Sequence, residues 1–341
     1  MNATSTLSHI HKSILSHTIV IITAKGGDIM SINNENHRKV AKTAFERIVI
    51  GKPIYHGGLT VFPLMFQQTD IPEHISLENA LEDKTVEITE ISEDGSVPEL
   101  LFANNGKEHV LLVDGEELIG AKQNRIINLS MLVAAESKLK IPVSCVEAGR
   151  WHYKSRIFSA GAFAPTSMRS RTKSETMNNA RSRGVYMSNQ HRVWNDVDRM
   201  MGDLGTHSES SAMHDGYEAM SSRLAEYTEM MKLPSDASGY IACIGKRVLG
   251  GDVFATSETL QKKWHRIIRS VVVESIRTGV MAEPSETEVA RDFLSAASDS
   301  IAEPYSPPGI GSGVHIEGDN VIGNVLIVEE AVLHISIFAQ M

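Results

Sequence analysis

Hydrophobic and polar positions along the first half of the chain follow the period of β-strands. Between residues 54 and 148, segments with strict alternation, such as TVEITEI, are interspersed with continuous apolar runs, such as LLVD and MLVA. Alternation is typical of a strand with one buried face, and a continuous run is typical of a strand buried on both faces. Many short strands joined by short turns favour a β-rich sandwich or roll.

The second half changes to helical spacing and then returns to strands. Apolar residues recur every three or four positions after residue 191, which predicts helices. GYIACIGKRVLGGDVF predicts a hairpin with its turn at Gly245 and Lys246, and VIGNVLIV and AVLHISIF predict closing strands. The pattern therefore predicts an α+β protein with an inserted helical segment and C-terminal strands that return to the sheet.

These patterns divide the chain into an N-terminal extension and one α+β domain. The extension is predicted at 1–53, with a helix at about 34–48, and the domain at 54–341. The domain comprises a β-rich half at 54–148, a basic loop at 149–190, and helices, a hairpin and C-terminal strands at 191–341. The segment 149–190 is predicted to be a long loop because it lacks sustained hydrophobic periodicity.

Charge is distributed unevenly along the 341 residues. The net charge of −9 argues against general nucleic-acid binding, which needs a surplus of Lys and Arg. Residues 70–117 contain fourteen acidic and two basic side chains, whereas residues 148–192 contain nine basic side chains and one acid. This local positive charge fits a small anionic ligand or a protein partner, including a second copy of the chain.

Cysteine content and hydropathy indicate a protein of the cytoplasm. Cys145 and Cys243 are the only cysteines, too few for a disulfide framework and without the spacing of a zinc site. The apolar run at 18–24 is too short for a membrane span, so we expect no membrane association. No motif specifies a metal, and the cofactor remains unknown.

The stretch GEELIGAKQNR concentrates polar side chains between two predicted core strands. Lys122 and Arg125 can hold phosphate or carboxylate oxygens, and the amides of Gln123 and Asn124 can orient a ligand. In an extended conformation Lys122 and Asn124 would point one way and Gln123 and Arg125 the other. The alternative is a solvated hairpin corner in which a Glu pairs with a Lys.

A second polar cluster, IPVSCVEAGRW, ends another predicted strand. Arg150 is a further candidate for a phosphate, and Trp151 offers a flat face to a base or sugar, although core packing would also explain it. If the protein is an enzyme, Glu117 or Glu147 is the candidate general base. Cys145 is interpreted as a buried structural thiol.

The strings GEELIGAKQNR and IPVSCVEAGRW, with VPELL before them and IGKRVLGGDVF and VLHISIF after them, resemble a known bacterial family. It is the ARG-and-rhodanese-phosphatase-superfamily-associated protein domain, where ARG denotes ADP-ribosylglycohydrolase, and the similarity spans about 59–338. The matching positions are Glu116, Glu117, Gly120, Lys122, Gln123, Asn124, Arg125, Asn128, Ser130, Pro142, Ser144, Cys145, Glu147, Gly149, Arg150 and Trp151. The resemblance implies a role near NAD-derived or ADP-ribose nucleotides, in bacterial defence or stress, and carries no catalytic assignment.

We therefore expect a protein that binds a phosphorylated nucleotide-like small molecule. If it is an enzyme, we expect it to hydrolyse this compound or to transfer a group from it. Glu116, Lys122, Gln123, Asn124, Arg125, Asn128, Arg150 and Trp151 are the predicted ligand-binding residues, and Glu117 and Glu147 the predicted catalytic ones. Three alternatives remain open: a non-catalytic ligand sensor, a scaffold or interaction protein that uses the basic segment, and a carbohydrate-active protein.

Overall fold

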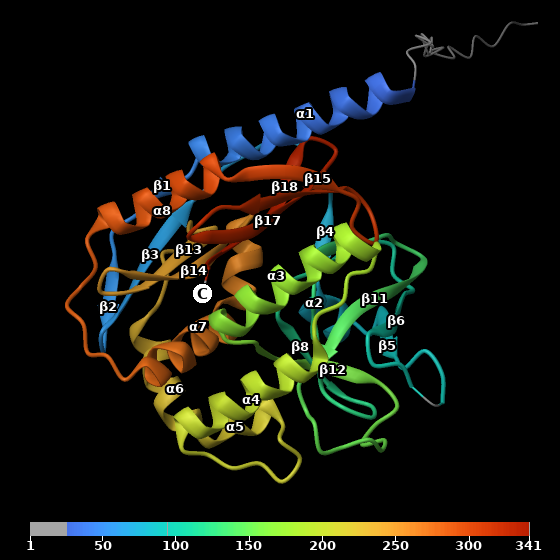
Figure 1. Ribbon diagram of the computed structural model, residues 1–341, viewed down its shortest axis with the longest axis vertical. Helices are drawn as coiled ribbons and strands as arrows, with labels where there is room; N and C mark the ends of the chain where they lie inside the picture. Colours follow the sequence, from blue (N-terminus) through green and yellow to red (C-terminus); the bar gives the residue numbers. More distant parts are fainter. Residues whose placement is uncertain (1–25, 94, 341) are drawn as a thin grey trace, which may run out of the picture.

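The computed structural model describes residues 26–93 and 95–340, and it has the α+β class that the hydrophobic pattern predicts (Figure 1). The apolar run at 18–24 lies outside the described residues. The helices are α1 (Gly26–Glu46), α2 (Leu77–Glu82), α3 (Thr166–Arg183), α4 (Gln190–Leu204), α5 (Met213–Ala219), α6 (Ser221–Met230), α7 (Ser257–Thr278) and α8 (Thr287–Asp299). Helix α1 begins and ends earlier than the helix predicted at 34–48.

A nine-stranded sheet has the order β1-β3-β13-β14-β18-β17-β16-β15, with β2 paired to β3. Its strands are β1 (Val49–Ile50), β2 (Ile54–His56), β3 (Leu59–Met65), β13 (Gly239–Ile244), β14 (Arg247–Phe254), β15 (Ile301–Tyr305), β16 (Ser312–Glu317), β17 (Val321–Val328) and β18 (Ala331–Ala339). The hairpin predicted at Gly245 and Lys246 forms between β13 and β14, and β18 lies beside β14. The C-terminal strands therefore do return to the sheet.

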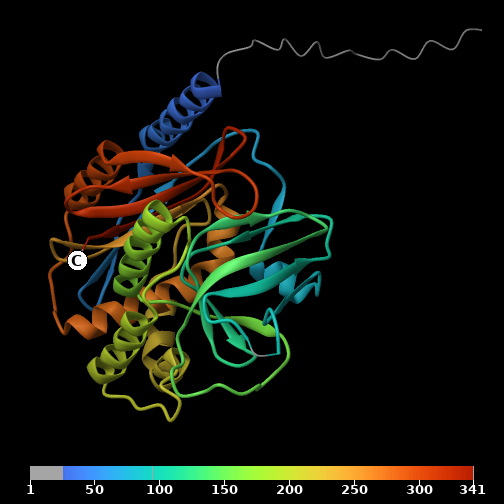
Figure 2. The same ribbon diagram turned by 45° about the vertical axis from the view of Figure 1, so that its right-hand side comes forward.

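Both faces of this large sheet are covered by helices. Helices α1 and α8 pack on one face, and α3 and α7 pack on the other (Figures 1 and 2). Side chains of β13 alternate between the two cores, since Tyr240 and Ala242 join the α7 side and Ile241 and Cys243 join the α1 and α8 side. Burial on both faces explains why these strands read as continuous apolar runs.

Two smaller sheets form the other side of the molecule, where the chain is coloured teal to green (Figure 2). Their orders are β12-β8-β9-β11-β6-β5 and β10-β7-β4. The strands are β4 (His74–Ser76), β5 (Val86–Thr89), β6 (Glu99–Asn104), β7 (His109–Leu112), β8 (Glu116–Gly120), β9 (Arg125–Ile127), β10 (Met131–Val133), β11 (Ser137–Cys145) and β12 (Phe158–Phe163). Both predicted polar clusters lie on this part of the fold.

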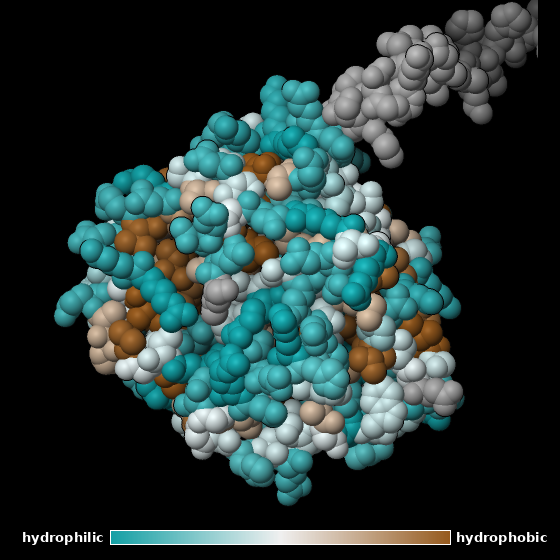
Figure 3. Space-filling model, viewed as in Figure 1, coloured by the Kyte–Doolittle hydropathy of each residue, from teal (hydrophilic) through white to brown (hydrophobic). Residues whose placement is uncertain are grey.

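The segment 149–190 is not the long basic loop that the sequence predicts, because it contains β12 and the helix α3. Helix α3 has no apolar stripe because its buried face is polar. Arg169 donates to both carboxylate oxygens of Asp252 at 2.8 Å, and Lys173 donates to Oδ1 of Asn324 at 2.8 Å, all fully or nearly fully buried. The outward side of α3 and α4 is part of the hydrophilic surface in Figure 3.

Candidate functional site

Most of the predicted site residues lie on β8 and β9 or on the turn between them, but the structure does not bring them to one place. Glu116 is fully buried at the start of β8, where its Oε1 accepts a hydrogen bond from Nζ of Lys263 at 2.6 Å. Lys263 also donates to Glu78 at 2.6 Å. Glu116 therefore belongs to an internal ion-pair cluster that fixes α7 against α2 and β8.

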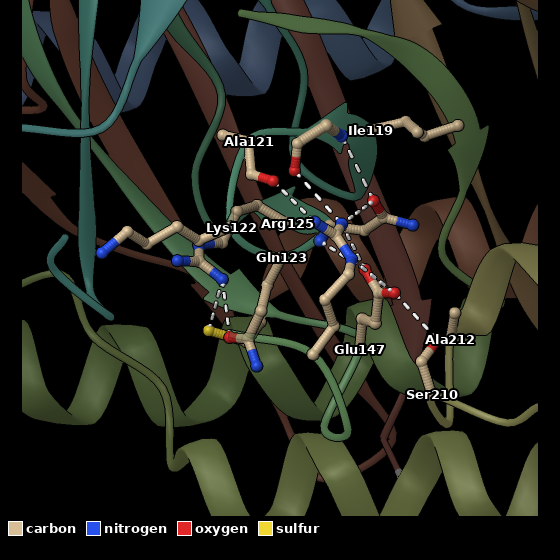
Figure 4. A network of polar contacts seen from close by, with 12 residues as sticks. Ile119, Ala121, Lys122, Gln123, Arg125, Glu147, Ser210 and Ala212 are labelled. Atoms are coloured by element: carbon tan, nitrogen blue, oxygen red, sulfur yellow. Dashed lines mark hydrogen bonds and ion pairs between the residues drawn. The ribbon is translucent and has the colours of Figure 1, made fainter. Parts of the chain in front are cut away.

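A second group is a closed network around Glu147 and Arg150 (Figure 4). Arg150 donates to both oxygens of Glu147, at 2.8 and 2.6 Å, and to the carbonyl of Ala121 at 2.5 Å. Glu147 also accepts from Ser210 at 2.8 Å and from the amide of Asn124 at 3.0 Å. Both side chains are almost wholly buried, and these bonds hold the turn of the hairpin to the segment before α5.

The same contacts make Glu147 a poor general base. Burial raises the pKa of its carboxyl, but hydrogen bonds from Arg150, the Asn124 amide and Ser210 outweigh burial, and the pKa is lowered. The carboxylate is stable as an anion and already has its hydrogen-bond partners. Glu147, Arg150 and Asn124 are thus hydrogen-bonded to one another and to the backbone, and their catalytic and ligand-binding roles stay predictions.

Arg125 and Gln123 form a third group, on the interior side of the small sheets. Arg125 is fully buried and donates through Nη1 to Oε1 of Gln123 at 2.9 Å and to Sγ of Cys145 at 2.8 Å. Glu90 lies 3.5 Å from Nη2, and among the described residues its Oε2 and Nε of Arg125 have no partner. Burial raises the pKa of the Cys145 thiol to about 11, so Cys145 is a structural thiol and not a nucleophile.

Lys122 extends away from Glu147 and Ser210 (Figure 4) and joins the Arg125 side. Its ammonium lies 5.4 Å from the ring centre of Trp151 and 5.2 Å from that of Tyr153, and it donates to the carbonyl of Glu93. Arg125 also faces Trp151, at 5.6 Å. The alternation expected for an extended conformation does not apply to Lys122 and Arg125, because the chain turns between β8 and β9 instead of continuing as an extended strand.

The two rings are about half exposed, Trp151 at 46% and Tyr153 at 40%. An exposed Trp with cations beside it fits the predicted stacking role better than core packing. Asn128 lies elsewhere, between β9 and β10, where its Oδ1 accepts from Ser144 at 2.7 Å and its Nδ2 donates to the carbonyl of Tyr186 at 3.3 Å. Asn128 is buried and its side chain serves to connect these segments.

Glu117 lies on the opposite face of the hairpin from Arg125. In the β8 and β9 register Glu117 pairs with Ile126, whereas Arg125 pairs with Leu118, so the two side chains leave the sheet on different sides. The Glu117 carboxylate is fully buried, and its Oε2 lies 3.2 Å from Nδ1 of His214 on α5. A carboxylate oxygen accepts, so Nδ1 carries the proton and Nε2 faces away from Glu117.

Local irregularity in β12 makes room for this carboxylate. The pairing of β12 with β8 shifts between Ala160 and Phe163, and the amide of Ala162 donates to Oε2 of Glu117 at 2.9 Å. A Cβ atom on Gly161 would come within 2.4 Å of the same oxygen. The glycine and the irregular strand thus place Glu117 beside His214, while its Oε1 has no partner among the described residues.

His214 has the electrostatic surroundings of a proton-transfer group. The hydrogen bond to Glu117 is the largest influence on its pKa, which is raised, and the charges of Glu218 and Asp215 act in the same direction against burial. Its side chain is 30% exposed, and Nδ1 is held by Glu117. A partly exposed His oriented by a buried carboxylate is the arrangement that general acid–base catalysis uses.

A hollow of about 380 Å³ lies next to this pair, between α6 and α7 and the end of α5. Its lining includes the titratable side chains of Glu218, Glu229, His265 and Arg269, together with Ser221 and Thr228 of α6. Oε1 of Glu218 lies 3.8 Å from Nε2 of His214. The hollow has the volume of a small-molecule site, and Glu218 is the lining residue that lies beside the pair.

The structure therefore places the predicted Glu117 at the best candidate site but separates it from every predicted ligand-binding residue. The residues that sequence reasoning missed are His214, Glu218 and Arg269. His214 and Glu218 lie one turn apart on α5 and Arg269 lies on α7, and no sequence motif joins them to Glu117, because they approach it only through the packing of α5 and α7 on β12. Within residues 26–93 and 95–340, no group of three or more His, Cys, Asp or Glu is arranged to hold a metal, and no helix is long and apolar enough to cross a bilayer.

The chain belongs to the ARG and Rhodanese-Phosphatase-superfamily-associated Protein domain family, whose model matches residues 47–338. The match includes both polar motifs, the Glu117 and His214 pair and the hollow, and it begins just after α1. No curated protein and no solved structure shows a significant match.

Proposed function

We propose that this protein is an enzyme that hydrolyses a small phosphorylated, nucleotide-like compound, or transfers a group from it, and that His214 and Glu117 carry the proton transfers. The contact between the buried Glu117 carboxylate and Nδ1 of His214, whose Nε2 lies 3.8 Å from Oε1 of Glu218 at the edge of the hollow, is the observation that supports catalysis. The Glu147 and Arg150 cluster has its partners within the protein, and the Arg125 cluster contains no histidine. The Glu117 pair is where acid–base chemistry fits best.

In the proposed reaction the bond between the leaving group and the phosphoryl or glycosyl centre breaks. His214 in its protonated form donates the Nε2 proton to the leaving oxygen, and Glu117 stabilises the imidazolium before that step. Water, or an acceptor hydroxyl in a transfer, forms the new bond and returns a proton to Nε2. Atoms and charge balance without a redox partner.

The substrate class rests on the family and not on a bound ligand. The family name records association with ADP-ribosylglycohydrolases and phosphatases, which favours a compound related to NAD or ADP-ribose in bacterial defence or stress. We further propose a cytoplasmic location, which the free, buried thiols of Cys145 and Cys243 support.

A second candidate is a ligand sensor that uses the opposite face of the hairpin. Its support is the half-exposed Trp151 and Tyr153 beside the ammonium of Lys122, a surface on which a planar, negatively charged compound can stack. In this candidate a ligand binds without turnover.

The test of the proposed function is a turnover screen with NAD, ADP-ribose, mononucleotides and phosphorylated sugars, with product detection by ³¹P NMR. His214→Ala should lower the rate on any responding compound by about 10²–10⁴-fold, the range for a general acid, and Glu117→Gln should act in the same direction. His191→Ala is the matched control, because His191 is an exposed histidine on α4. Equal rates for His214→Ala and His191→Ala would refute the assignment, and stabilisation by a compound that is never turned over would favour the sensor.

A further inference from the structure

Arg269 differs from the other arginines that face the interior. Arg125, Arg150, Arg169 and Arg266 each donate hydrogen bonds to protein acceptors. Among the described residues Arg269 donates none, its Nε is buried without a partner, and its nearest carboxylate oxygen, on Glu218, is 3.7 Å from Nη2. Its side chain is about a third exposed and lines the hollow beside α6, so the guanidinium is available to a ligand.

Glu218 stands between two cationic groups. Its Oε1 lies 3.7 Å from Nη2 of Arg269 and 3.8 Å from Nε2 of His214, longer than hydrogen bonds in both cases. Glu218 is 60% exposed at the end of the short helix α5, so its side chain can leave this position at little cost. The carboxylate therefore marks a place where an anion is attracted from two sides but is not firmly bound.

We propose that the hollow is the anion subsite of the substrate, and that a phosphate group binds between Arg269 and His214 in the position that the Glu218 carboxylate occupies. This inference rests on the proposed function and specifies it: the substrate carries its phosphate within reach of Nε2 of His214. Arg269 supplies planar donors that match phosphate oxygens, and His265 and the hydroxyls of Ser221 and Thr228 line the same space.

The other acidic side chains near the hollow do not prevent an anion from binding there. Glu229 also lines it, but its carboxylate pairs with Lys232, which follows the end of α6. Burial lowers the pKa of His265 and the charge of Arg266 lowers it further, so His265 is a neutral donor or acceptor at pH 7. The phosphate replaces the Glu218 carboxylate, which swings into solvent, so charge repulsion between the two is avoided.

The experiment measures binding of inorganic phosphate to the full-length protein by calorimetry and by the NMR shift of the His214 ring. Arg269→Ala should weaken phosphate binding roughly 10–100-fold, the effect of losing hydrogen bonds to a charged group. Glu218→Gln should tighten it several-fold, because the internal competitor loses its charge and keeps its size. Arg291→Ala is the matched control, since Arg291 pairs with Glu288 on α8 and is well exposed.

Unchanged affinity in Arg269→Ala, weaker affinity in Glu218→Gln, or no phosphate binding to any variant would each overturn the subsite. The same titration with Glu117→Gln separates this inference from the catalytic one. Phosphate should still bind when Glu117 is neutral, so retained phosphate binding with a lowered turnover rate in Glu117→Gln supports both proposals. Retained phosphate binding with an unchanged turnover rate in Glu117→Gln would support the subsite and refute the acid–base pair. If Arg269→Ala retains turnover with an unchanged KM, the acid–base pair is supported and the subsite is refuted.

Discussion

Two regions around the β8 and β9 hairpin show different uses of polar residues. At the turn, Glu147 and Arg150 saturate each other and the backbone around them. On β8, Glu117 has one oxygen bonded and one without a described partner, and its partner His214 is partly exposed. A dense polar motif is therefore a weak sign of a site, whereas incomplete satisfaction beside a hollow is a stronger one, because a ligand can supply the missing partner.

The largest expected effect concerns the saturated network. Arg150→Ala should destabilise the protein by about 3–5 kcal/mol, because it leaves the buried Glu147 carboxylate without its charged partner. Chemical denaturation measures this effect. The double variant Arg150→Met with Glu147→Met should recover most of the stability, and Arg269→Ala should change it by less than about 0.5 kcal/mol. Similar losses of stability in Arg150→Ala and Arg269→Ala would contradict the difference between the two regions.

Gly161→Ala should disrupt the incompletely satisfied region. The added Cβ would stand 2.4 Å from Oε2 of Glu117, so the carboxylate must leave His214. We expect a stability loss of about 1–3 kcal/mol from overpacking and a rate loss of about 10²-fold, the lower end for general acid–base catalysis. Gly202→Ala on α4 is the control, because nothing lies within 4 Å of its added Cβ. Full activity in Gly161→Ala would argue against the Glu117 role.

Lys122→Ala tests whether the aromatic side of the hairpin binds the ligand. The lost contacts with Trp151 and Tyr153 should cost about 0.5–2 kcal/mol of stability. If the sensor candidate is right, ligand-induced thermal stabilisation disappears in this variant; if the proposed enzyme is right, stabilisation and turnover both remain. Differential scanning fluorimetry with and without the responding compound distinguishes these outcomes.

The smallest expected effect is a pH dependence of the free energy of unfolding that arises from His214. The pKa of His214 in the folded protein is raised, mainly by Glu117 and also by Glu218 and Asp215. The guanidinium of Arg269 lies on the other side of the Glu218 carboxylate. The stabilisation is therefore fully present below the ordinary His pKa of about 6.5 and is lost as pH rises through the folded value. NMR titration of the His ring protons gives the folded pKa, and unfolding at a series of pH values should show that Glu117→Gln loses this dependence. An unshifted His214 in the wild type would contradict the pair.

The secondary structure could be predicted wherever side chains of one kind share a face. The continuous apolar runs of β17 and β18 and the hairpin turn at Gly245 follow from hydrophobic period and turn chemistry. Helix α3 could not be found in this way, because its buried face carries Arg169, Lys173 and several hydroxyl side chains, with only Met168 and Met177 as apolar residues. A hydrophobic period detects only helices whose buried contacts are apolar.

The candidate site was predictable only in part. Glu117 was identified because it is a carboxylate within a polar motif between core strands. Glu147 sits in an equally polar motif, and only the contacts show that its partners are already supplied. The roles of the two carboxylates could not be separated from the sequence, since both motifs contain the same residue types.

The sequence by itself determined the α+β class, the return of the C-terminal strands and the family, because these depend on local period and on motifs that are contiguous in the chain. Only the tertiary structure decided which charges remain available. Glu117, His214 and Arg269 are far apart in the sequence and lie close because β12, α5 and α7 pack together. Availability to a ligand is a property of the contacts around a side chain, and folding creates those contacts.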